Sequence, residues 1–419
     1  MPIHLRCERL RVLGLITNRI SSIFTEALII EGQFPASMRD WFAARTKRLQ
    51  ISGIRKMFEM AGPDSINLGL GELDFQPSEK AMNALAEAVK AGYNRYGPTR
   101  GIPELRTVLA ERLTRYRPDV EMENIIITAG GTQGLMVTAM TLFDHGDEVL
   151  TPDPGFVIYQ PHVIMCGATP LRYSLKFEND FQPNPDEIQE LITPRTKAII
   201  INSPNNPTSG ILTPETIKAL RDIAVDNEMV IISDEVYDEI IFEGEHHSML
   251  NPDYDNVVYV NSFSKTFAVT GWRLGYLASS KYMVNQLAKI QYYNIACPPT
   301  PLQKAIYEVM KAPTNMIHER VGELTKRRDA IVKRCNDIPG FSCLKPNGAF
   351  YVFPSFDQDI SSEDFAMELV KNNLICAPGS AFGKGGEGHL RFSFANSLEN
   401  IEKGMDIVEK VARGIPRKK

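Results

Sequence analysis

A lysine set among aromatic and small polar residues is the most reactive group that the sequence offers. Lys265 follows a Ser-Phe-Ser run at 262–264 and precedes Arg273 by eight residues. Lysines are mostly solvated in proteins, but the neighbours Phe267 and Trp272 disfavour a solvated face here. A lysine in partly apolar surroundings near other cations loses proton affinity and becomes nucleophilic. The pattern therefore favours a nucleophilic amine at Lys265.

A glycine-rich loop earlier in the chain has features of an anion site. It reads Thr-Ala-Gly-Gly-Thr-Gln over 128–133 and leads into a predicted helix at 134–142. Glycines let backbone N–H groups approach an anion, and a helix N-terminus supplies a favourable dipole. A strand-to-helix turn needs glycine in any case, and neither the dinucleotide fingerprint nor the P-loop pattern is present. Phosphate binding and a plain turn both remain open for this loop.

Two more polar loops follow apolar, strand-like runs. The loop at 202–208 reads Asn-Ser-Pro-Asn-Asn-Pro-Thr, and a stiff turn alone would explain it. Asp234 comes directly after the apolar run at 229–233. An acid in that position either caps the next helix or holds a charge for a ligand. The residues by themselves leave both interpretations open.

Apolar strand-like runs alternate with helical patterns up to about residue 300. The helix predicted at 214–227 has Thr213 as N-cap and Pro214 at its first position. Alternating strands and helices predict a mostly parallel sheet, and such sheets bind ligands at the carboxyl ends of their strands. The four loops above lie at such ends. Strands are predicted at 125–128, 148–152, 197–202, 229–233, 257–260 and 274–278.

After about residue 300 the pattern changes to long charged helices. These are predicted at 319–335 and 397–413, with short strands near 348–353 and 389–394. The pattern indicates a smaller α+β domain that residues near 40–70 join. The expected divisions are an extension without function at 1–37, the N-terminal segment of the small domain at 38–70, the large domain at 71–300 and the C-terminal small domain at 301–419.

Composition limits the classes of partner. The 419 residues contain 46 Lys and Arg against 51 Asp and Glu, which gives a net charge of -5. No basic face is expected, which argues against nucleic acid or an anionic membrane as the main partner. The histidines and cysteines lack metal-ligand spacing, and no apolar run is long enough to span a bilayer. A cytoplasmic location is the default expectation, with no metal.

Three motifs in a fixed order carry a family resemblance. They are Asn-Pro at 206–207, Asp-x-x-Tyr at 234–237 and Ser-x-Ser-Lys-x-x-x-x-x-Gly-x-Arg at 262–273. With them, the chain from about 40 to about 412 resembles the class I aminotransferases, which are fold-type I enzymes dependent on pyridoxal 5'-phosphate (PLP). It looks most like the aspartate and aromatic aminotransferases. The resemblance implies an α/β fold with a mostly parallel seven-stranded sheet between helices, plus a smaller α+β domain.

The resemblance also implies roles for individual residues. Lys265 would be the Schiff-base lysine and would then move the proton at the substrate Cα. Asp234 would pair with the pyridinium nitrogen and keep it protonated. Asn206 and Tyr237 would hydrogen-bond the 3'-oxygen of the ring. Further cofactor-binding residues implied are Gly131, Thr132, Ser262, Ser264 and Arg273 at the phosphate and Phe156 stacked on the ring, and substrate-binding residues are Gly71, Asn206 and Arg391, the last at the α-carboxylate.

Tyr96 matches a tyrosine that reaches the phosphate of the neighbouring subunit in the family. The resemblance therefore implies a homodimer with shared active sites, although simple packing would also explain this residue. The expected substrates are an L-amino acid, aromatic or aspartate, and a 2-oxo acid such as 2-oxoglutarate. Some relatives that prefer dicarboxylates have a lysine where this chain has Thr132, which removes one argument for aspartate.

Two other functions are compatible with parts of this pattern. A PLP-dependent β-lyase on the same scaffold differs in whether the substrate carbanion is reprotonated on the cofactor carbon or expels a leaving group. The cofactor motifs do not separate these reactions, but product analysis does. A transcription regulator built on this scaffold would need an N-terminal DNA-reading module. The 37 residues before Met38 are too few for one.

Overall fold

The computed structural model describes residues 41–49, 53–62, 64–311 and 315–418. The chain divides into two units, Met1–Lys47 and Arg48–Lys419. Within the first unit, helix α2 (Ala44–Lys47) has no buried residue. The extension expected at 1–37 lies outside the described residues. The central sheet and the cavity at its edge belong to the second unit.

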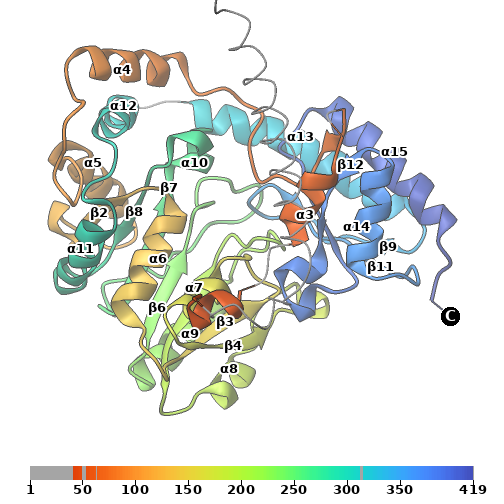
Figure 1. Cartoon of the computed structure of the whole chain (residues 1–419), viewed down its shortest axis with the longest axis horizontal. Helices are drawn as coiled ribbons and strands as arrows, with labels where there is room; N and C mark the ends of the chain where they lie inside the picture. The colour runs from red at the N-terminus through yellow and green to blue at the C-terminus, as the bar shows by residue number, and fades with distance from the viewer. Residues whose placement is uncertain (1–40, 50–52, 63, 312–314, 419) are drawn as a thin grey trace, which may run out of the picture. The chain divides into compact units, whose positions relative to one another are not determined.

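A seven-stranded sheet forms the centre of the fold (Figure 1). Its strand order is β2-β8-β7-β6-β5-β3-β4. Only β8 runs antiparallel to its neighbours, so the expected mostly parallel, seven-stranded sheet is confirmed. The strands are β2 (Ile125–Thr128), β3 (Glu148–Asp153), β4 (Thr169–Ser174), β5 (Thr196–Asn202), β6 (Val230–Asp234), β7 (Val257–Ser262) and β8 (Gly275–Ala278).

Six of these strands coincide with predicted ones to within two residues, and β4 is the strand that sequence reading missed. β4 lies at the edge of the sheet and pairs only with β3. Thr169 and Arg172 are exposed, so β4 lacks the continuous apolar run of a covered strand. Pro170 is also tolerated there, because an edge strand leaves one row of backbone groups unpaired.

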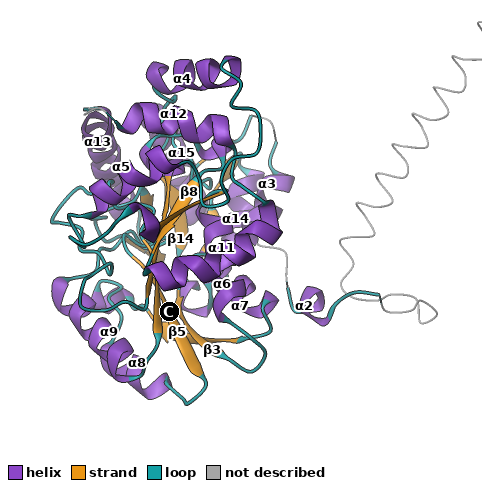
Figure 2. Cartoon of the chain, turned by 90° about the vertical axis from the view of Figure 1, so that its left-hand side faces the viewer, coloured by secondary structure: helices purple, strands orange, loops and turns teal. Residues whose placement is uncertain are grey.

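Helices cover both faces of the sheet, as the apolar strands require (Figure 2). Neighbouring residues of one strand serve opposite faces: Ile126 packs in one core cluster, and Ile125 and Ile127 pack in another. The first cluster includes residues of α6 (Gly131–Leu142), α7 (Tyr159–Met165) and α11 (Lys281–Ile295). The opposite face is covered by α5 (Pro103–Leu113), α12 (Thr300–Met310), α8 (Pro185–Leu191) and α9 (Pro214–Asp226). α4 (Glu79–Lys90) packs against α12.

The C-terminal part has its own core, which includes Phe365, Leu369 and Val408. The predicted helices at 319–335 and 397–413 correspond to α13 (Met316–Asp337) and α15 (Leu398–Gly414). Figure 1 shows these beside α3 (Gly53–Met60) and α14 (Ser362–Lys371). The short strands are β1 (Ile66–Asn67), β9 (Phe341–Ser342), β10 (Tyr351–Val352), β11 (Ser355–Phe356), β12 (Leu374–Ile375), β13 (Ala377–Pro378) and β14 (Leu390–Ser393).

β1 pairs in parallel with β12, so the chain before residue 70 and the C-terminal part share a small sheet. The exact domain boundaries remain predictions. Among the described residues, no helix is both long and apolar enough to cross a membrane. Nor does any group of three or more His, Cys, Asp or Glu within that part of the chain have the arrangement of a metal site.

Candidate active site

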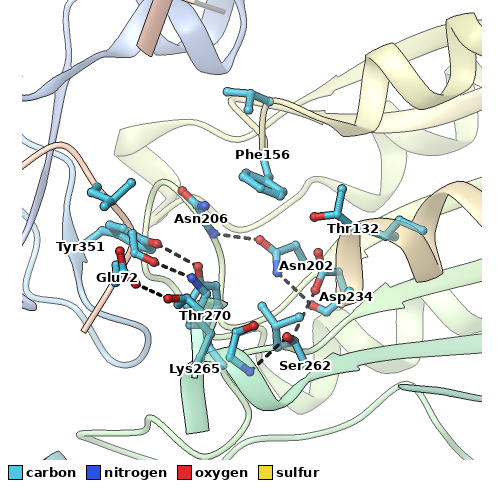
Figure 3. A pocket seen from close by; sticks show the side chains of 18 of the residues that line it. Glu72, Thr132, Phe156, Asn202, Asn206, Asp234, Ser262, Lys265, Thr270 and Tyr351 are labelled. Carbon is cyan, nitrogen blue, oxygen red and sulfur yellow. Dashed lines mark hydrogen bonds between the residues drawn. The ribbon is translucent and has the colours of Figure 1, made fainter. Parts of the chain in front are cut away.

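The carboxyl ends of the central strands open into a cavity of about 520 Å³ (Figure 3). Its wall also includes loops and strands from the C-terminal part, since Tyr351 and Arg391 belong to β10 and β14. Twelve of the thirteen predicted site residues line this one cavity. They are Gly71, Gly131, Thr132, Phe156, Asn206, Asp234, Tyr237, Ser262, Ser264, Lys265, Arg273 and Arg391.

Lys265 lies on the short helix α10 (Phe263–Thr266), which directly follows β7. Its Nζ donates a hydrogen bond to the carbonyl oxygen of Gly71. Burial, assisted by the charges of Arg391 and Arg273, lowers the pKa of Lys265 to about 8. The sequence expectation of an amine with reduced proton affinity therefore has a structural basis: the side chain is enclosed and two guanidinium groups lie near it.

Asp234 is the last residue of β6 and lines the cavity. Its Oδ2 accepts a 2.7 Å hydrogen bond from Tyr159 Oη, and its Oδ1 accepts a 3.4 Å hydrogen bond from Val236 N. Burial raises the pKa of Asp234 to about 6, although the Tyr159 hydrogen bond opposes the rise. The carboxylate has unused acceptor capacity, which a cationic ligand atom can take.

The glycine-rich loop and Arg273 form a cradle of hydrogen-bond donors. Gly130 has φ of +84°, and a Cβ there would lie 2.6 Å from Arg273 Nη2. The loop therefore needs glycine to let the guanidinium approach the N-terminus of α6. Thr132 stands at the start of that helix (Figure 3). Backbone N–H groups, a helix dipole and a guanidinium together attract a phosphate.

The two serines before Lys265 differ in their remaining capacity. Ser262 Oγ accepts from Ser264 N at 3.2 Å and donates to Leu274 O at 3.2 Å, so it caps α10. Ser264 Oγ is buried and has no hydrogen-bond partner in the described part of the chain. Buried hydroxyls normally find a partner. Ser264 is therefore the serine with a donor available for a ligand.

Arg391 is buried and joins both halves of the site. Its Nη1 donates to Asn206 Oδ1 at 2.9 Å and its Nη2 donates to Gly69 O at 2.5 Å. Its Nε is buried with no partner in the residues that the structure describes. The guanidinium also lies 4.4 Å from the ring centroid of Tyr351, whose hydroxyl contacts that of Tyr237 at 2.9 Å. The fork is thus oriented by polar and aromatic contacts.

Phe156 and Gly71 shape the walls of the cavity. Phe156 points into it (Figure 3) and meets Tyr159 edge to face, with ring centroids 5.7 Å apart. A Cβ on Gly71 would lie 2.1 Å from Tyr351 Oη, so a side chain at that position would collide with the tyrosine. Glycine at 71 therefore serves a close approach rather than only a turn.

Tyr96 is the predicted site residue that does not line the cavity. Its side chain is 90% exposed. The role that the resemblance implies for it requires a second subunit, so it stays a prediction. The roles of the other twelve residues also stay predictions, although the structure brings their side chains together.

Several lining residues were missed by the sequence reading. Tyr159 bonds Asp234, Asn202 Nδ2 donates to the backbone carbonyl of Asp234 at 2.8 Å, and Tyr351 contacts Arg391. Thr270 Oγ1 donates to Glu72, which ties the loop after Lys265 to the segment beside Gly71. Asn202 opens the asparagine-rich loop and so carried a local signal. Tyr159 and Tyr351 carried none, because their partners are distant in the sequence.

The family model described as "Aminotransferase class I and II" matches residues 63–408. A probable aspartate aminotransferase of Methanocaldococcus jannaschii is 39% identical over 376 residues, covering 88% of this chain and 99% of that protein. An aromatic-amino-acid aminotransferase 2 of Thermococcus litoralis is 38% identical over 380 residues, covering 88% and 97%.

The fold agrees with these relatives. A solved alanine aminotransferase of Pyrococcus furiosus superposes with a TM-score of 0.85 at 35% identity, covering 89% of this chain and 100% of that one. Both the sequence match and the structural match extend over the central sheet and the C-terminal part. The chain therefore belongs to the class I and II aminotransferases and is a transaminase.

Proposed function

We propose that this transaminase binds PLP in the cavity described above and attaches it through Lys265. The observation that carries the proposal is a buried amine and a buried carboxylate in one cavity, with a lowered pKa at Lys265 and a raised pKa at Asp234. Ionisable groups perturbed in this way within a cleft are typical of functional sites.

Two sets of lining residues fit two parts of PLP. Ser264 Oγ lacks a partner among the described atoms, and Arg273 approaches Gly130 at the start of α6. With Gly131 and Thr132, these groups suit a phosphate dianion, and Ser262 would join them by giving up its hydrogen bond to Leu274 O. Asp234 has acceptor capacity for a protonated ring nitrogen, and Phe156 offers an aromatic face. The residues present therefore fit the group.

When bound, PLP supplies an aldehyde carbon that exchanges amino groups and a ring that withdraws electrons from the substrate Cα. Lys265 Nζ removes the proton from that Cα. Its pKa of about 8 leaves a usable neutral fraction near neutral pH, where a solvated lysine would be almost fully charged. Burial of this amine is thus what makes it a competent base.

Asp234 holds the proton on the ring nitrogen. Its carboxyl is ionised above a pKa of about 6, and a cation beside it would favour the ionised form further. Tyr159 donates to one carboxylate oxygen and fixes its orientation. Asn206 and Tyr237 are the donors proposed for the 3'-oxygen of the ring.

Arg391 binds the α-carboxylate of the amino acid. A guanidinium in a buried site forms paired hydrogen bonds to a planar carboxylate. Its Nε is free to donate within the described part of the site, and contacts with Asn206 and Gly69 fix the plane of the fork. The substrate passes close to the backbone at Gly71, where a Cβ would collide with Tyr351.

The proposed donor is an aromatic amino acid or aspartate, and the proposed acceptor is a 2-oxo acid such as 2-oxoglutarate. The names of the relatives support this range without choosing within it. Phe58, Leu70 and Val157 also line the cavity and offer an apolar surface to a side chain. The relatives described above are all named aminotransferases, so the β-lyase alternative gains no support from them.

We further propose a homodimer in which Tyr96 reaches the phosphate site of the partner subunit. The tyrosine is 90% exposed and does not line the cavity of its own subunit. Tyr293 is 87% exposed and Tyr292 is 56% exposed, so further aromatic surface is open to solvent. Large exposed aromatic groups of this kind favour an interface.

Mixing two variants tests the shared site. A heterodimer of Lys265→Ala with Tyr96→Ala has one site that carries both defects and one site that carries neither. If the sites are shared, mixing restores tight PLP binding and turnover in the second site. If each site is built from one subunit, mixing restores nothing, and the proposed role of Tyr96 is wrong.

The visible absorption spectrum of the purified protein tests the proposed reaction. With PLP bound, addition of the right amino acid should bleach the band of the lysine-bound cofactor, and 2-oxoglutarate should restore it. Comparing phenylalanine, tyrosine, aspartate and alanine ranks the donors. A band that no amino acid changes would contradict the proposal, and release of pyruvate and ammonia would favour a lyase.

A further inference from the structure

A second buried carboxylate stands next to Asp234 in the chain. Glu235 is 1% exposed and belongs to the far side of the strand end, because successive residues of an extended strand point to opposite faces. Its Oε1 accepts from Ser233 Oγ at 2.7 Å, from Ser248 Oγ at 2.9 Å and from Met249 N at 3.1 Å. All three partners act as donors, which is the pattern of an ionised, acceptor-only carboxylate.

The other oxygen of Glu235 pairs with a histidine. His246 Nε2 lies 2.7 Å from Glu235 Oε2, and the two side chains are 4% and 1% exposed. The imidazole meets Tyr116 edge to face, and its Nδ1 has no partner in the described part of the chain. Burial lowers the pKa of His246, but the hydrogen bond and charge of Glu235 raise it, with a net rise above the ordinary value.

The charged groups that face the Glu235–His246 pair are largely paired with one another. Asp238 and Arg115 face it, and Arg115 is itself paired with Asp238 and Glu239. A cavity of about 400 Å³ opens beside His246, so protons from solvent reach the pair. Its other charged and titratable lining groups are Tyr116, Lys218, Arg221, Glu245 and His247.

We propose that Glu235 and His246 are positioning residues for the cofactor site: their combined charge sets the electrostatic potential at Asp234 and at the PLP that it binds. The inference rests on the proposed PLP function. It is carried by the adjacency of Glu235 and Asp234 in one strand end and by the closed set of contacts around Glu235.

The sign of the effect follows from the charges. With His246 protonated, the pair is neutral and Asp234 is the net negative group beside the ring nitrogen. When His246 loses its proton, the pair carries one negative charge. That charge favours protonation of nearby groups, including the linkage between Lys265 and the cofactor. The pH midpoint of the visible band of the bound cofactor should therefore rise.

The test measures that midpoint in the holoenzyme. His246→Gln keeps a donor to Glu235 but removes the positive charge and should raise the midpoint. Glu235→Gln removes the negative charge together with the group that raises the pKa of His246, so the pair stays neutral and the midpoint should stay unchanged. An uncompensated unit charge at this strand end predicts an upward shift on the order of one pH unit in His246→Gln. Ser248→Ala is the matched control, since it removes a hydrogen bond to the same carboxylate without changing charge.

A raised midpoint in His246→Gln, with the midpoints of Glu235→Gln and Ser248→Ala unchanged, would support the inference. No shift in His246→Gln, or shifts of one sign in all three variants, would overturn it in favour of a purely structural role. His246→Gln decides the question alone if Glu235→Gln fails to fold. Loss of the visible band in the unaltered protein would instead refute the PLP proposal, and this inference with it.

Discussion

Asp234 and Glu235 are consecutive carboxylates with opposite environments. Asp234 accepts hydrogen bonds from Tyr159 and Val236 N, and burial raises its pKa to about 6. Glu235 is equally buried but accepts from three donors at one oxygen and pairs with His246 at the other. The side of Asp234 is left incomplete, whereas the carboxylate of Glu235 is saturated.

The difference identifies which polar groups await a ligand. Ser264 Oγ and Arg391 Nε, on the side of Asp234, are buried without partners among the described residues. Ser248 Oγ, on the side of Glu235, is engaged. An unpaired buried polar group costs stability. The incomplete side therefore carries a stability cost that a bound cofactor and substrate would remove.

The largest expected effect comes from removing the amine of Lys265, which lies on the side of Asp234. Lys265→Ala should lower turnover by about 10⁴-fold, because the base at the substrate Cα is lost. PLP should still bind without a covalent bond. Single-turnover kinetics and the visible spectrum measure both effects. Lys403→Ala, an exposed residue of α15, is the control and should keep normal turnover; near-normal turnover in Lys265→Ala would contradict the assignment.

Asp234→Asn tests the contrast between the two buried carboxylates most directly. Turnover should fall by roughly 10²- to 10³-fold, because the ring nitrogen loses its charged partner. The apoenzyme should nevertheless become more stable above a pH of about 6, by roughly 3 kcal/mol, since an ionised buried carboxylate is removed. Denaturant unfolding of the apoenzyme at several pH values measures this.

The sign of that pH dependence follows from the raised pKa. Asp234 changes from the ordinary value of 3.8 to about 6 on folding, so its destabilisation grows between those values and is absent below them. The gain in Asp234→Asn should therefore vanish in acid. Glu235→Gln should destabilise at neutral pH instead, because it leaves donors without a matched acceptor. Equal responses of the two variants would refute the contrast between them.

Arg391→Lys keeps the charge but loses the planar fork. kcat/KM should fall by roughly 10- to 100-fold, mostly through a higher KM, because a point charge replaces paired hydrogen bonds to the α-carboxylate. Steady-state kinetics with a range of amino acids measures this. Arg334→Lys, whose side chain pairs with Glu402 and Asp406 of α15 and does not line the cavity, should leave kcat/KM unchanged. An unchanged kcat/KM in Arg391→Lys would assign the carboxylate to another group.

Tyr159→Phe should have the smallest effect. It removes one hydrogen bond to Asp234 while keeping the ring against Phe156, so kcat should fall only about five-fold. Tyr173→Phe also removes a buried hydroxyl, which bonds Ile200 O, and should leave kcat unchanged. Equal kcat values for the two variants would mean that Tyr159 does not act through Asp234.

The sequence predicted the features that depend on local patterns, namely the buried strands and the residues at their carboxyl ends. The buried strands appear as apolar runs, and the residues that follow them lie at their carboxyl ends, so Lys265 and Asp234 could be placed at the site in advance. The edge strand β4 escaped because its exposed residues break the apolar pattern. Arg391 was predicted from the family resemblance, while its contacts with Asn206 and Gly69 required the fold.

Partners that are distant in the sequence could not be predicted. Tyr159 lies 75 residues before Asp234, and the contact between Tyr237 and Tyr351 spans 114 residues. The adjacent pair His246 and His247 gave no metal-ligand signal in the sequence. The pairing of His246 with Glu235 depends on how the loop folds back on the strand end. Periodicity does not encode such contacts.

The most direct test of the account is to locate the lysine that binds PLP. Borohydride reduction of the holoenzyme fixes a lysine–PLP linkage as a stable secondary amine, and peptide mass spectrometry then finds it. The account predicts one modified peptide, which contains Lys265, and none in the Lys265→Ala variant. Stoichiometric labelling of another lysine, or an unlabelled protein that still transaminates, would contradict the central claim.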